Sequence, residues 1–287
     1  MPVMGSRTAT GAGRQRPAPV RFYAWLVCAV VCGLTFPAAA KLPCAADRID
    51  ERVRVSFVQD GDTLMLNDGR RLRVIGIDTP ELGRQGNAAQ PGAIAARDRL
   101  RQLMFIHKQQ LSLRLDAERH DRYGRLLAHA FVGDGQNLAE LLLAAGAGTH
   151  IIVPPNTWQA ACYAEAARTA RRQGIGIWAL PTFQPKPVSQ LDLRSKGFHI
   201  VHGRVSHLSN SASAIWVNLV GDFALRIERA DLNQFQGMDL DSLVGSEIEV
   251  QGWIHAGNGQ LRMPLRHPHA LTVIAPRVTA SEPAPVE

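Results

Sequence analysis

The sequence predicts an α+β protein that is built mainly from β-strands and contains two small barrels in succession. Three observations indicate this fold class. Apolar residues alternate over 52–77, strand-like and helical patterns then follow as far as residue 180, and more strand-like segments appear after a proline-rich stretch. With 287 residues, 46% of them hydrophobic, the chain is long enough for two modest cores.

The first predicted barrel begins with a three-stranded meander over 52–77. Its β-branched and apolar residues recur at every second position, and turn signals at Asp60-Gly61 and Asp68-Gly69 divide it. Pro91 then opens a helical pattern. The elements expected next are a helix over 93–105 and strands over 110–115 and 126–132.

Two further helices are expected to complete this region. Asn137 is the predicted cap of a helix over 138–145, which Gly146 ends, and Asn156 or Thr157 is the predicted cap of the last helix. Three strands, a helix, two strands and two helices are the order of a five-stranded OB-like barrel.

The N-terminal 40 residues have the composition of a secretory signal peptide. They contain four arginines and no acid, then an apolar run and a small-residue exit at Ala38-Ala39-Ala40. The alternative is an uncleaved membrane anchor, although the apolar run is short for a span. We therefore expect an exported protein, periplasmic or secreted.

The chain is expected to consist of five segments. They are a signal peptide at 1–40, the first barrel domain at 41–180, a stiff linker at 181–197, an OB-like accessory domain at 198–275 and a disordered tail at 276–287.

The basic charge of the chain is concentrated in the predicted leader. The full net charge is +7, but without residues 1–40 there are 28 Lys and Arg against 25 Asp and Glu, a net charge of +3. Such a small excess does not by itself indicate binding to a polyanion. Individual residues must therefore indicate the function.

Cysteine usage is compatible with export. Cys28 and Cys32 lie in the predicted leader, which leaves Cys44 and Cys162. In an oxidising compartment these two can form a disulfide; two unrelated buried thiols are the alternative. Neither residue lies in a C-x-x-C pattern, so zinc binding and redox catalysis have little support.

Three short motifs contain the residues that could bind a metal or take part in catalysis. They are Asp60-Gly61-Asp62-Thr63, the run from Arg73 to Glu81, and the run from Asp121 to Arg125. Carboxylates are hard oxygen ligands that suit Ca²⁺, and another carboxylate can act on a water molecule. Arginine presents a planar fork that matches phosphate oxygens. Together these groups indicate metal-assisted hydrolysis of a phosphodiester.

The second motif must contain a bend. Arg73 and Asp78 are five positions apart, so a regular strand would place them on opposite faces. Gly76 permits a distortion, and Pro80 forces Thr79 into an extended conformation. We therefore expect the chain to turn before Asp78 and to bring both side chains into one site.

Each motif taken alone also has an ordinary structural interpretation. Asp-Gly-Asp commonly forms a turn, Asp-Thr-Pro-Glu can begin a helix, and Arg125 can be a surface ion-pair residue. An EF-hand is excluded, because the twelfth loop position counted from Asp60 is Arg71 and not Glu.

In their order and internal spacing, the three motifs resemble those of the thermonuclease (staphylococcal nuclease-like) family over roughly residues 52–180. The resemblance implies a Ca²⁺-dependent nuclease that cleaves DNA and RNA with little sequence preference and leaves 3′-phosphate ends. A catalytically weak or inactive nucleic-acid-binding module is the alternative. Its signature would be the loss of Glu81, Arg73 or an aspartate, and the sequence retains them.

The resemblance also implies a role for each residue. These roles are Ca²⁺ ligation by the side chains of Asp62 and Asp78 and by the backbone carbonyl of Thr79, support from Asp60 behind the metal, activation of water by Glu81, and phosphate binding by Arg73 and Arg125.

Other features of the sequence are less specific. The loop at 149–155 lacks the paired tyrosines that stack on the nucleotide base in familiar family members. His267-Pro268-His269 is interpreted as a surface loop. Trp216 and Trp253 are either core residues or stacking platforms of a nucleic-acid-binding barrel.

Overall fold

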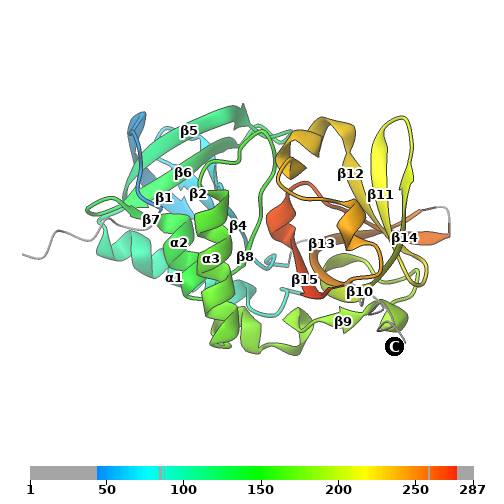
Figure 1. The fold of residues 1–287 in the computed structure, drawn as a ribbon. Helices are drawn as coiled ribbons and strands as arrows, with labels where there is room; N and C mark the ends of the chain where they lie inside the picture. Colours follow the sequence, from blue (N-terminus) through cyan, green and yellow to red (C-terminus); the bar gives the residue numbers. More distant parts are fainter. Residues whose placement is uncertain (1–43, 84–85, 87, 258, 277–287) are drawn as a thin grey trace, which may run out of the picture. The chain divides into compact units, whose positions relative to one another are not determined.

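A computed structural model describes residues 44–276 with the exception of 84, 85, 87 and 258 (Figure 1). The predicted signal peptide and all but the first residue of the predicted tail therefore lie outside the described residues. Within the described part of the chain, no helix combines the length and apolar character needed to cross a membrane.

The described residues of the first region form eight strands and three helices. The strands are β1 (Glu51–Val58), β2 (Thr63–Leu66), β3 (Arg71–Val74), β4 (Ile77–Asp78), β5 (Gln110–His120), β6 (Leu126–Val132), β7 (Gln136–Asn137) and β8 (Thr149–His150). The helices are α1 (Ala93–Ile106), α2 (Leu138–Ala144) and α3 (Ala160–Arg172), and the 3₁₀ turns η1 (Gly176–Ala179) and η2 (Pro181–Phe183) follow them.

Five of these strands close into a barrel. The sheet has the order β3-β2-β1-β5-β6-β7, and an additional pairing joins β3 to β6. That pairing is parallel, with Leu72 opposite Leu126, whereas the other barrel pairings are antiparallel. The predicted α+β class and the predicted five-stranded barrel are confirmed.

The barrel core follows from the alternation of the meander. Val55, Leu64, Leu66 and Leu72 are buried, and Leu100 of α1 is fully buried against the same cluster. Side chains of α2 and α3 complete this cluster. Removing this apolar surface from water is the main favourable contribution to folding.

Of the two predicted helix caps, the cap of α2 is confirmed and the cap of α3 is wrong. The Asn137 side chain accepts a hydrogen bond (3.2 Å) from the third backbone N–H of α2, so it caps that helix. Neither Asn156 nor Thr157 caps α3, which begins after Gln159. The Asn156 amide instead bonds to the backbone N–H and C=O of Glu118 in β5, both at 2.8 Å.

The expected bend before Asp78 lies at Gly76. Its φ is 96°, which glycine adopts readily, and β4 begins at the next residue and pairs with β8 (Figure 1). A Cβ at this position would lie 2.5 Å from ring atoms of Tyr163. Backbone conformation and close packing therefore both require glycine here.

The segment at 181–197 connects two cores by packing into both. Phe183 belongs to the barrel core, and Val188 belongs to the core of the C-terminal region. Within the segment, β9 (Lys186–Pro187) pairs in parallel with the next strand, and η3 (Val188–Gln190) follows it. Its side chains are thus part of the fold.

The C-terminal region has its own seven-stranded sheet. Its further elements are β10 (Gly197–Asn210), β11 (Ala214–Leu219), β12 (Phe223–Glu228), η4 (Arg229–Phe235), η5 (Asp241–Leu243), β13 (Glu247–Gly257), β14 (Gln260–Pro264), η6 (Pro268–Ala270) and β15 (Leu271–Ala275). The strand order is β15-β13-β14-β12-β11-β10-β9.

This second sheet is ring-like but is not a regular barrel. Strand β10 pairs first with β13 and then with β11, and β12 pairs in parallel with β14. The ring departs from the expected OB-like barrel because β13 and β14 share only three residue pairs, and because β9 and β15 extend the sheet. The sequence pattern does not indicate β14, a short strand that ends in a proline.

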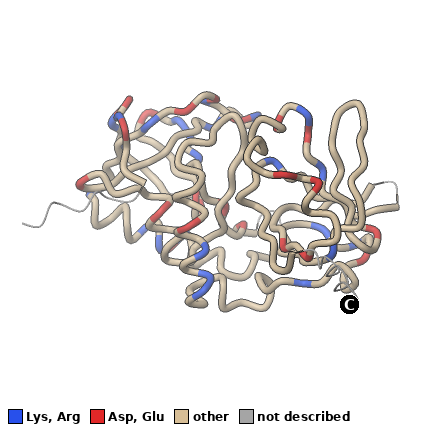
Figure 2. Tube along the Cα trace, in the orientation of Figure 1, with Lys and Arg blue, Asp and Glu red and all other residues tan. Residues whose placement is uncertain are grey.

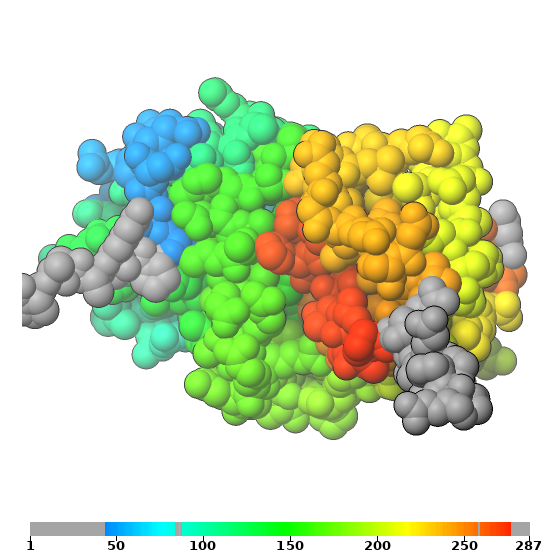
Figure 3. Space-filling view, viewed as in Figure 1, coloured from blue at the N-terminus to red at the C-terminus, as the bar shows by residue number. Residues whose placement is uncertain are grey.

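Polar contacts join the C-terminal sheet to α3 and β8 of the first region. Arg171 donates to Glu249 at 2.8 Å, and the Gln251 amide donates to the backbone carbonyl of His150 at 3.1 Å. In Figure 3 the orange and red C-terminal residues abut the green residues of the helical region. Ile200 of β10 is buried in the barrel core cluster, so the two regions also share apolar packing.

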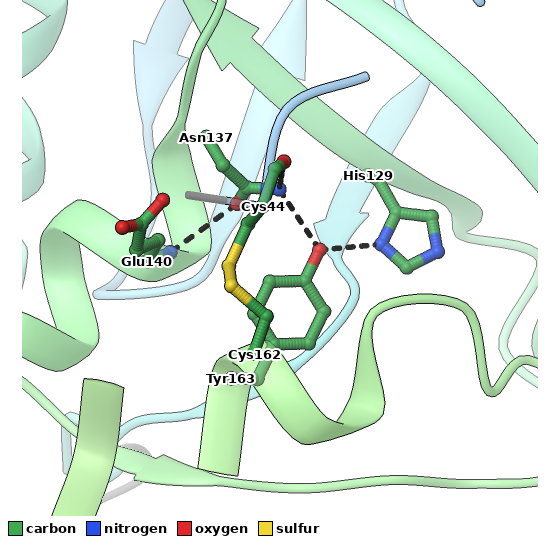
Figure 4. The surroundings of a disulfide bond; sticks show 6 residues. All are labelled: Cys44, His129, Asn137, Glu140, Cys162 and Tyr163. Carbon is green, nitrogen blue, oxygen red and sulfur yellow. Dashed lines mark hydrogen bonds between the residues drawn. A yellow bond between two sulfur atoms is a disulfide. The ribbon is translucent and has the colours of Figure 1, made fainter. Parts of the chain in front are cut away.

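A disulfide links Cys44 to Cys162 in α3 across 118 residues of sequence (Figure 4). Beside it, the Tyr163 hydroxyl lies 2.7 Å from Nδ1 of His129 and accepts a hydrogen bond from the Asn137 amide at 3.0 Å. A cross-link that closes so long a loop restricts the unfolded chain. The disulfide and the polar network therefore fix α3 against β6 and α2.

Candidate active site

Arg73 lies among the acidic residues that the motifs supply. Its Nη1 is 3.1 Å from an Asp62 oxygen, and its Nη2 is 2.8 Å from Oδ1 of Asp78. The guanidinium also donates to the carbonyl of Ile77 at 2.7 Å, and 13% of the side chain is exposed. The bend at Gly76 thus brings the arginine of β3 and the aspartate of β4 together.

Asp62 is held in place by hydrogen bonds from two segments. Thr79 donates to its Oδ2 from the backbone N–H (2.9 Å) and from the hydroxyl (3.0 Å), while the Thr63 hydroxyl donates to its Oδ1 at 3.0 Å. A Cβ on Gly61 would lie 2.6 Å from the Thr79 hydroxyl, so glycine permits this approach. The Asp62 backbone N–H donates to Asp60 at 3.2 Å.

Arg125 approaches the same group from the loop between β5 and β6. Its Nε donates to Asp121 at 2.6 Å, and its Nη1 lies 3.5 Å from the Thr63 hydroxyl. Arg125 is therefore an ion-pair residue, and it also reaches the side chain that contacts Asp62. The Thr63 hydroxyl therefore links Arg125 to Asp62, which contacts Arg73.

Glu81 lies on an exposed segment just beyond Thr79. Its backbone N–H donates to the Gln90 side chain at 2.9 Å, and the Gln90 N–H donates to the Glu81 carbonyl at 2.9 Å. These bonds close the loop between the two residues. The Glu81 carboxylate is near enough to affect the pKa values of Arg73 and Asp78.

One guanidinium faces four carboxylates at this site. The carboxylates belong to Asp60, Asp62, Asp78 and Glu81. Burial lowers the pKa of Arg73, but the carboxylates outweigh it and raise that pKa. Burial also raises the pKa of Asp78 to about 6, although Arg73 opposes the change. Elsewhere acidic and basic residues are interspersed along the trace, as Figure 2 shows.

The excess of carboxylate oxygen fits a hard divalent cation. Ca²⁺ takes about six to eight oxygen ligands in irregular geometry, including backbone carbonyls such as that of Thr79. Arg73 binds the same oxygens of Asp62 and Asp78 in this structure. A bound cation would therefore compete with the guanidinium for these carboxylates.

A second group of possible metal ligands lies at the disulfide. Among the described residues, this is the one trio of His, Cys, Asp or Glu side chains whose ligand atoms all lie within 4.8 Å of one another: Cys44, Glu140 and Cys162. The disulfide removes both thiolates, which are the form of cysteine that binds metals. We therefore assign it no metal.

A cleft of about 480 Å³ borders the two arginines. Its walls include Arg73, Tyr123, Arg125, Val153 and, from the C-terminal region, Arg266. The arginines line a concave surface large enough for a phosphodiester and part of its flanking groups. Both regions of the chain therefore contribute to the cleft.

The structure brings together the residues that the motifs predict and adds three that sequence reasoning misses in this role. Thr63 connects Asp62 to Arg125, and Gln90 fixes the segment of Glu81. The Asp-Gly-Asp-Thr run contains Thr63, so that residue had a local signal. Gln90 had none.

The third missed residue is Trp253 of β13. It lines a small cavity together with Asp78, and 37% of the residue is exposed. Trp253 is thus not a core residue. His267 and His269, in contrast, form a local turn in which the His269 N–H donates to Nδ1 of His267 at 3.2 Å.

Comparison with known proteins places this site in a family. The family model described as staphylococcal nuclease homologue matches residues 71–180. The chain is 32% identical to the thermonuclease of Staphylococcus intermedius over 131 residues. These residues make up 45% of this chain and 76% of that protein. The chain is 30% identical over 133 residues to the thermonuclease of Staphylococcus hyicus, with 45% and 77% covered.

A Bacillus subtilis (strain 168) protein named endonuclease YncB shows a similar level of identity. It is 32% identical over 125 residues, which cover 42% of this chain and 58% of that protein. The C-terminal sheet described above lies beyond the residues that the family model matches. The chain therefore belongs to the staphylococcal nuclease family and carries an additional C-terminal region with its own sheet.

Proposed function

We propose that this protein is an exported, Ca²⁺-dependent nuclease that hydrolyses phosphodiester bonds of DNA and RNA with low sequence specificity and leaves 3′-phosphate ends. The observation that carries the proposal is the meeting of Asp62, Asp78 and Arg73, with Arg125 and Glu81 at its edge. Family membership and the names of the related nucleases support it.

The two arginines would bind the scissile phosphate from one side of the cleft. Each guanidinium offers a planar fork to phosphate oxygens and remains charged, so Arg73 and Arg125 can neutralise charge that develops on those oxygens. Asp121 orients Arg125 by accepting from its Nε at 2.6 Å. The cation, when bound, supplies Lewis-acid polarisation of the phosphate.

Glu81 is the proposed general base. Its carboxylate belongs to an exposed residue, whereas Asp60 and Asp62 are buried. An exposed carboxylate beside the cation ligands can hold a water molecule and accept its proton as the water attacks phosphorus. General-base help of this kind typically contributes a factor of about 10² to 10⁴ in rate.

Export is supported by the composition of residues 1–40 and by the disulfide. Disulfides persist in oxidising compartments such as a periplasm or the extracellular space. Substrates of the enzyme would then be DNA and RNA encountered outside the cytoplasm.

A zymogram tests the enzymatic proposal. In a gel cast with DNA, the wild-type band should clear its substrate with Ca²⁺ and should not clear it with a chelator. The Glu81→Gln variant should lose about 10² or more in rate, because an amide cannot accept the proton. The matched control is Glu165→Gln, which alters an exposed glutamate of α3 that pairs with Arg168.

The same gel separates the enzyme from a non-catalytic binding module. Calcium-dependent clearing that survives in Glu81→Gln would remove the base assignment while leaving the nuclease. Absence of clearing by the wild type, together with retention of DNA in a mobility-shift assay, would support the binding module instead.

A further inference from the structure

Next to the cation ligands is a small cavity that both regions of the chain enclose. It measures about 140 Å³. One wall comes from the first region and includes Asp78, Ile151 and Val153, and the other wall comes from the C-terminal sheet and includes Phe198, Trp253 and Arg266. Asp78 therefore belongs both to the wall of this cavity and to the proposed active site.

Trp253 and Asp78 line the same cavity, so the indole lies near a proposed cation ligand. Trp253 is 37% exposed. On the neighbouring strand β10, Phe198 lies directly opposite Trp253. A partly exposed indole beside an active site, with a second aromatic residue opposite it on the next strand, can serve as an aromatic platform.

Arg266 connects the cavity to the phosphate cleft. It lines both spaces. Its guanidinium is fixed by two hydrogen bonds to Asp231, at 2.8 and 3.2 Å, and it donates to the carbonyl of Pro154 at 3.3 Å. A ligand whose phosphate lies at Arg73 can therefore extend past Arg266 into the cavity.

The chemistry of the walls selects the occupant. Ile151, Val153, Phe198 and Trp253 provide apolar and aromatic surface, and Gln251 adds a polar group. A flat heteroaromatic ring with polar edges fits such a lining, and every nucleobase offers a π-face to an aromatic side chain. Stacking of this kind tolerates any base, which agrees with low sequence preference.

We propose that the C-terminal sheet supplies a nucleobase subsite, in which Trp253 stacks on the base of a nucleotide that flanks the scissile phosphate. This inference rests on the proposed nuclease function. It gives the C-terminal sheet a direct role in substrate binding, and it places the base contact on β13, in a chain whose 149–155 loop contains no tyrosine.

Steady-state cleavage of two oligonucleotides tests the subsite. One is a single-stranded oligothymidylate, and the other is an abasic strand of equal length with the same phosphates. For the wild type, KM should be lower for the strand that carries bases. In Trp253→Leu, KM for that strand should rise about tenfold, and KM for the abasic strand should stay within about twofold.

Two variants separate stacking from other effects. Trp253→Phe keeps an aromatic ring, so it should retain most of the base dependence. Trp216→Leu changes another tryptophan of the same sheet, which stacks near Arg226 and Arg262 and does not line the cavity. It should behave as the wild type does.

Binding without turnover keeps this test independent of catalysis. Fluorescence anisotropy of both labelled strands is measured with the Glu81→Gln protein, with and without Trp253→Leu. Loss of the base-dependent affinity difference supports the subsite even if the protein does not cleave. Equal weakening of binding to both strands, or no change in binding to either, would overturn the inference. Loss of the base-dependent affinity difference in a Tyr123→Leu variant that keeps Trp253 would also overturn it, because Tyr123 would then be the base contact.

Discussion

Arg73 combines two tasks that a lysine could not perform together. Its guanidinium reaches Asp62 and Asp78 at the same time, through separate nitrogens. A lysine ammonium is a compact charge without this fork. We therefore expect Arg73→Lys to lower kcat by about 10² to 10³ on single-stranded DNA. Steady-state kinetics with saturating Ca²⁺ measures the change.

The control for Arg73→Lys is Arg70→Lys on the same β2–β3 hairpin. Arg70 pairs with Glu51 and Asp68, and its side chain is 37% exposed. This variant should keep the wild-type kcat, because neither ion-pair partner of Arg70 belongs to the candidate site. If Arg73→Lys also kept the wild-type kcat, the guanidinium would not contact the transition state.

At the scale of single residues, the sequence predicts most of the candidate site but not its support. Asp62, Arg73 and Asp78 are identifiable because their chemistry and spacing are local properties of two motifs. The contact of Trp253 and Asp78 with one shared cavity depends on how two sheets pack, across a large separation in sequence. No local pattern encodes that contact.

At the scale of elements, the bend between β3 and β4 determines whether the site forms. Gly76 has a positive φ, and a Cβ there would lie 2.5 Å from the Tyr163 ring. Gly76→Ala should therefore lower the free energy of unfolding by about 2 to 4 kcal/mol, through strain and overpacking. Chemical denaturation measures this loss, and cleavage of DNA should fall with it.

Gly69→Ala provides a matched control for that prediction. Gly69 also has a positive φ, 87°, but no atom of the described residues lies within 4 Å of the position that a Cβ would occupy there. Its substitution should cost about 1 kcal/mol from backbone strain alone. Equal losses in the two variants would show that the Tyr163 contact does not limit the bend.

The sequence predicts long elements better than short ones for a physical reason. The meander, α1 and α2 have enough residues to show a hydrophobic period, and Asn137 carries its capping signal locally. β4 and β8 have two residues each and exist only because they pair with each other. Asn156 fails as a predicted cap because its amide bonds to a distant strand.

At the scale of the whole molecule, one buried histidine joins the two regions. Nε2 of His150 donates to the carbonyl of His269 at 3.0 Å, and the Gln251 amide donates to its Nδ1 at 3.2 Å. This pattern requires the neutral imidazole, because a protonated Nδ1 would face another donor. Positive charge on His269, Arg168 and His267 also lowers the pKa of this imidazole.

Acid should therefore weaken the contact between the two regions. Burial, the largest cause, lowers the pKa of His150 to about 4 from an unfolded value of 6.5. Because the folded protein disfavours the proton, the contribution of His150 is complete above pH 6.5. It is lost progressively as pH falls toward 4, by an amount on the order of 3 kcal/mol.

Denaturant unfolding at a series of pH values from about 7.5 to about 4.5 measures this dependence. His150→Leu removes the titrating group, so its free energy of unfolding should decrease less steeply below pH 6.5 than that of the wild type, whatever its stability at neutral pH. His120→Leu, at the exposed end of β5, controls for the loss of a histidine elsewhere. Parallel curves for wild type and His150→Leu would show that another group carries the acid sensitivity. A shallower curve would identify His150 as the residue through which pH acts on the attachment of the C-terminal sheet, and hence on the cavity that Trp253 and Arg266 line.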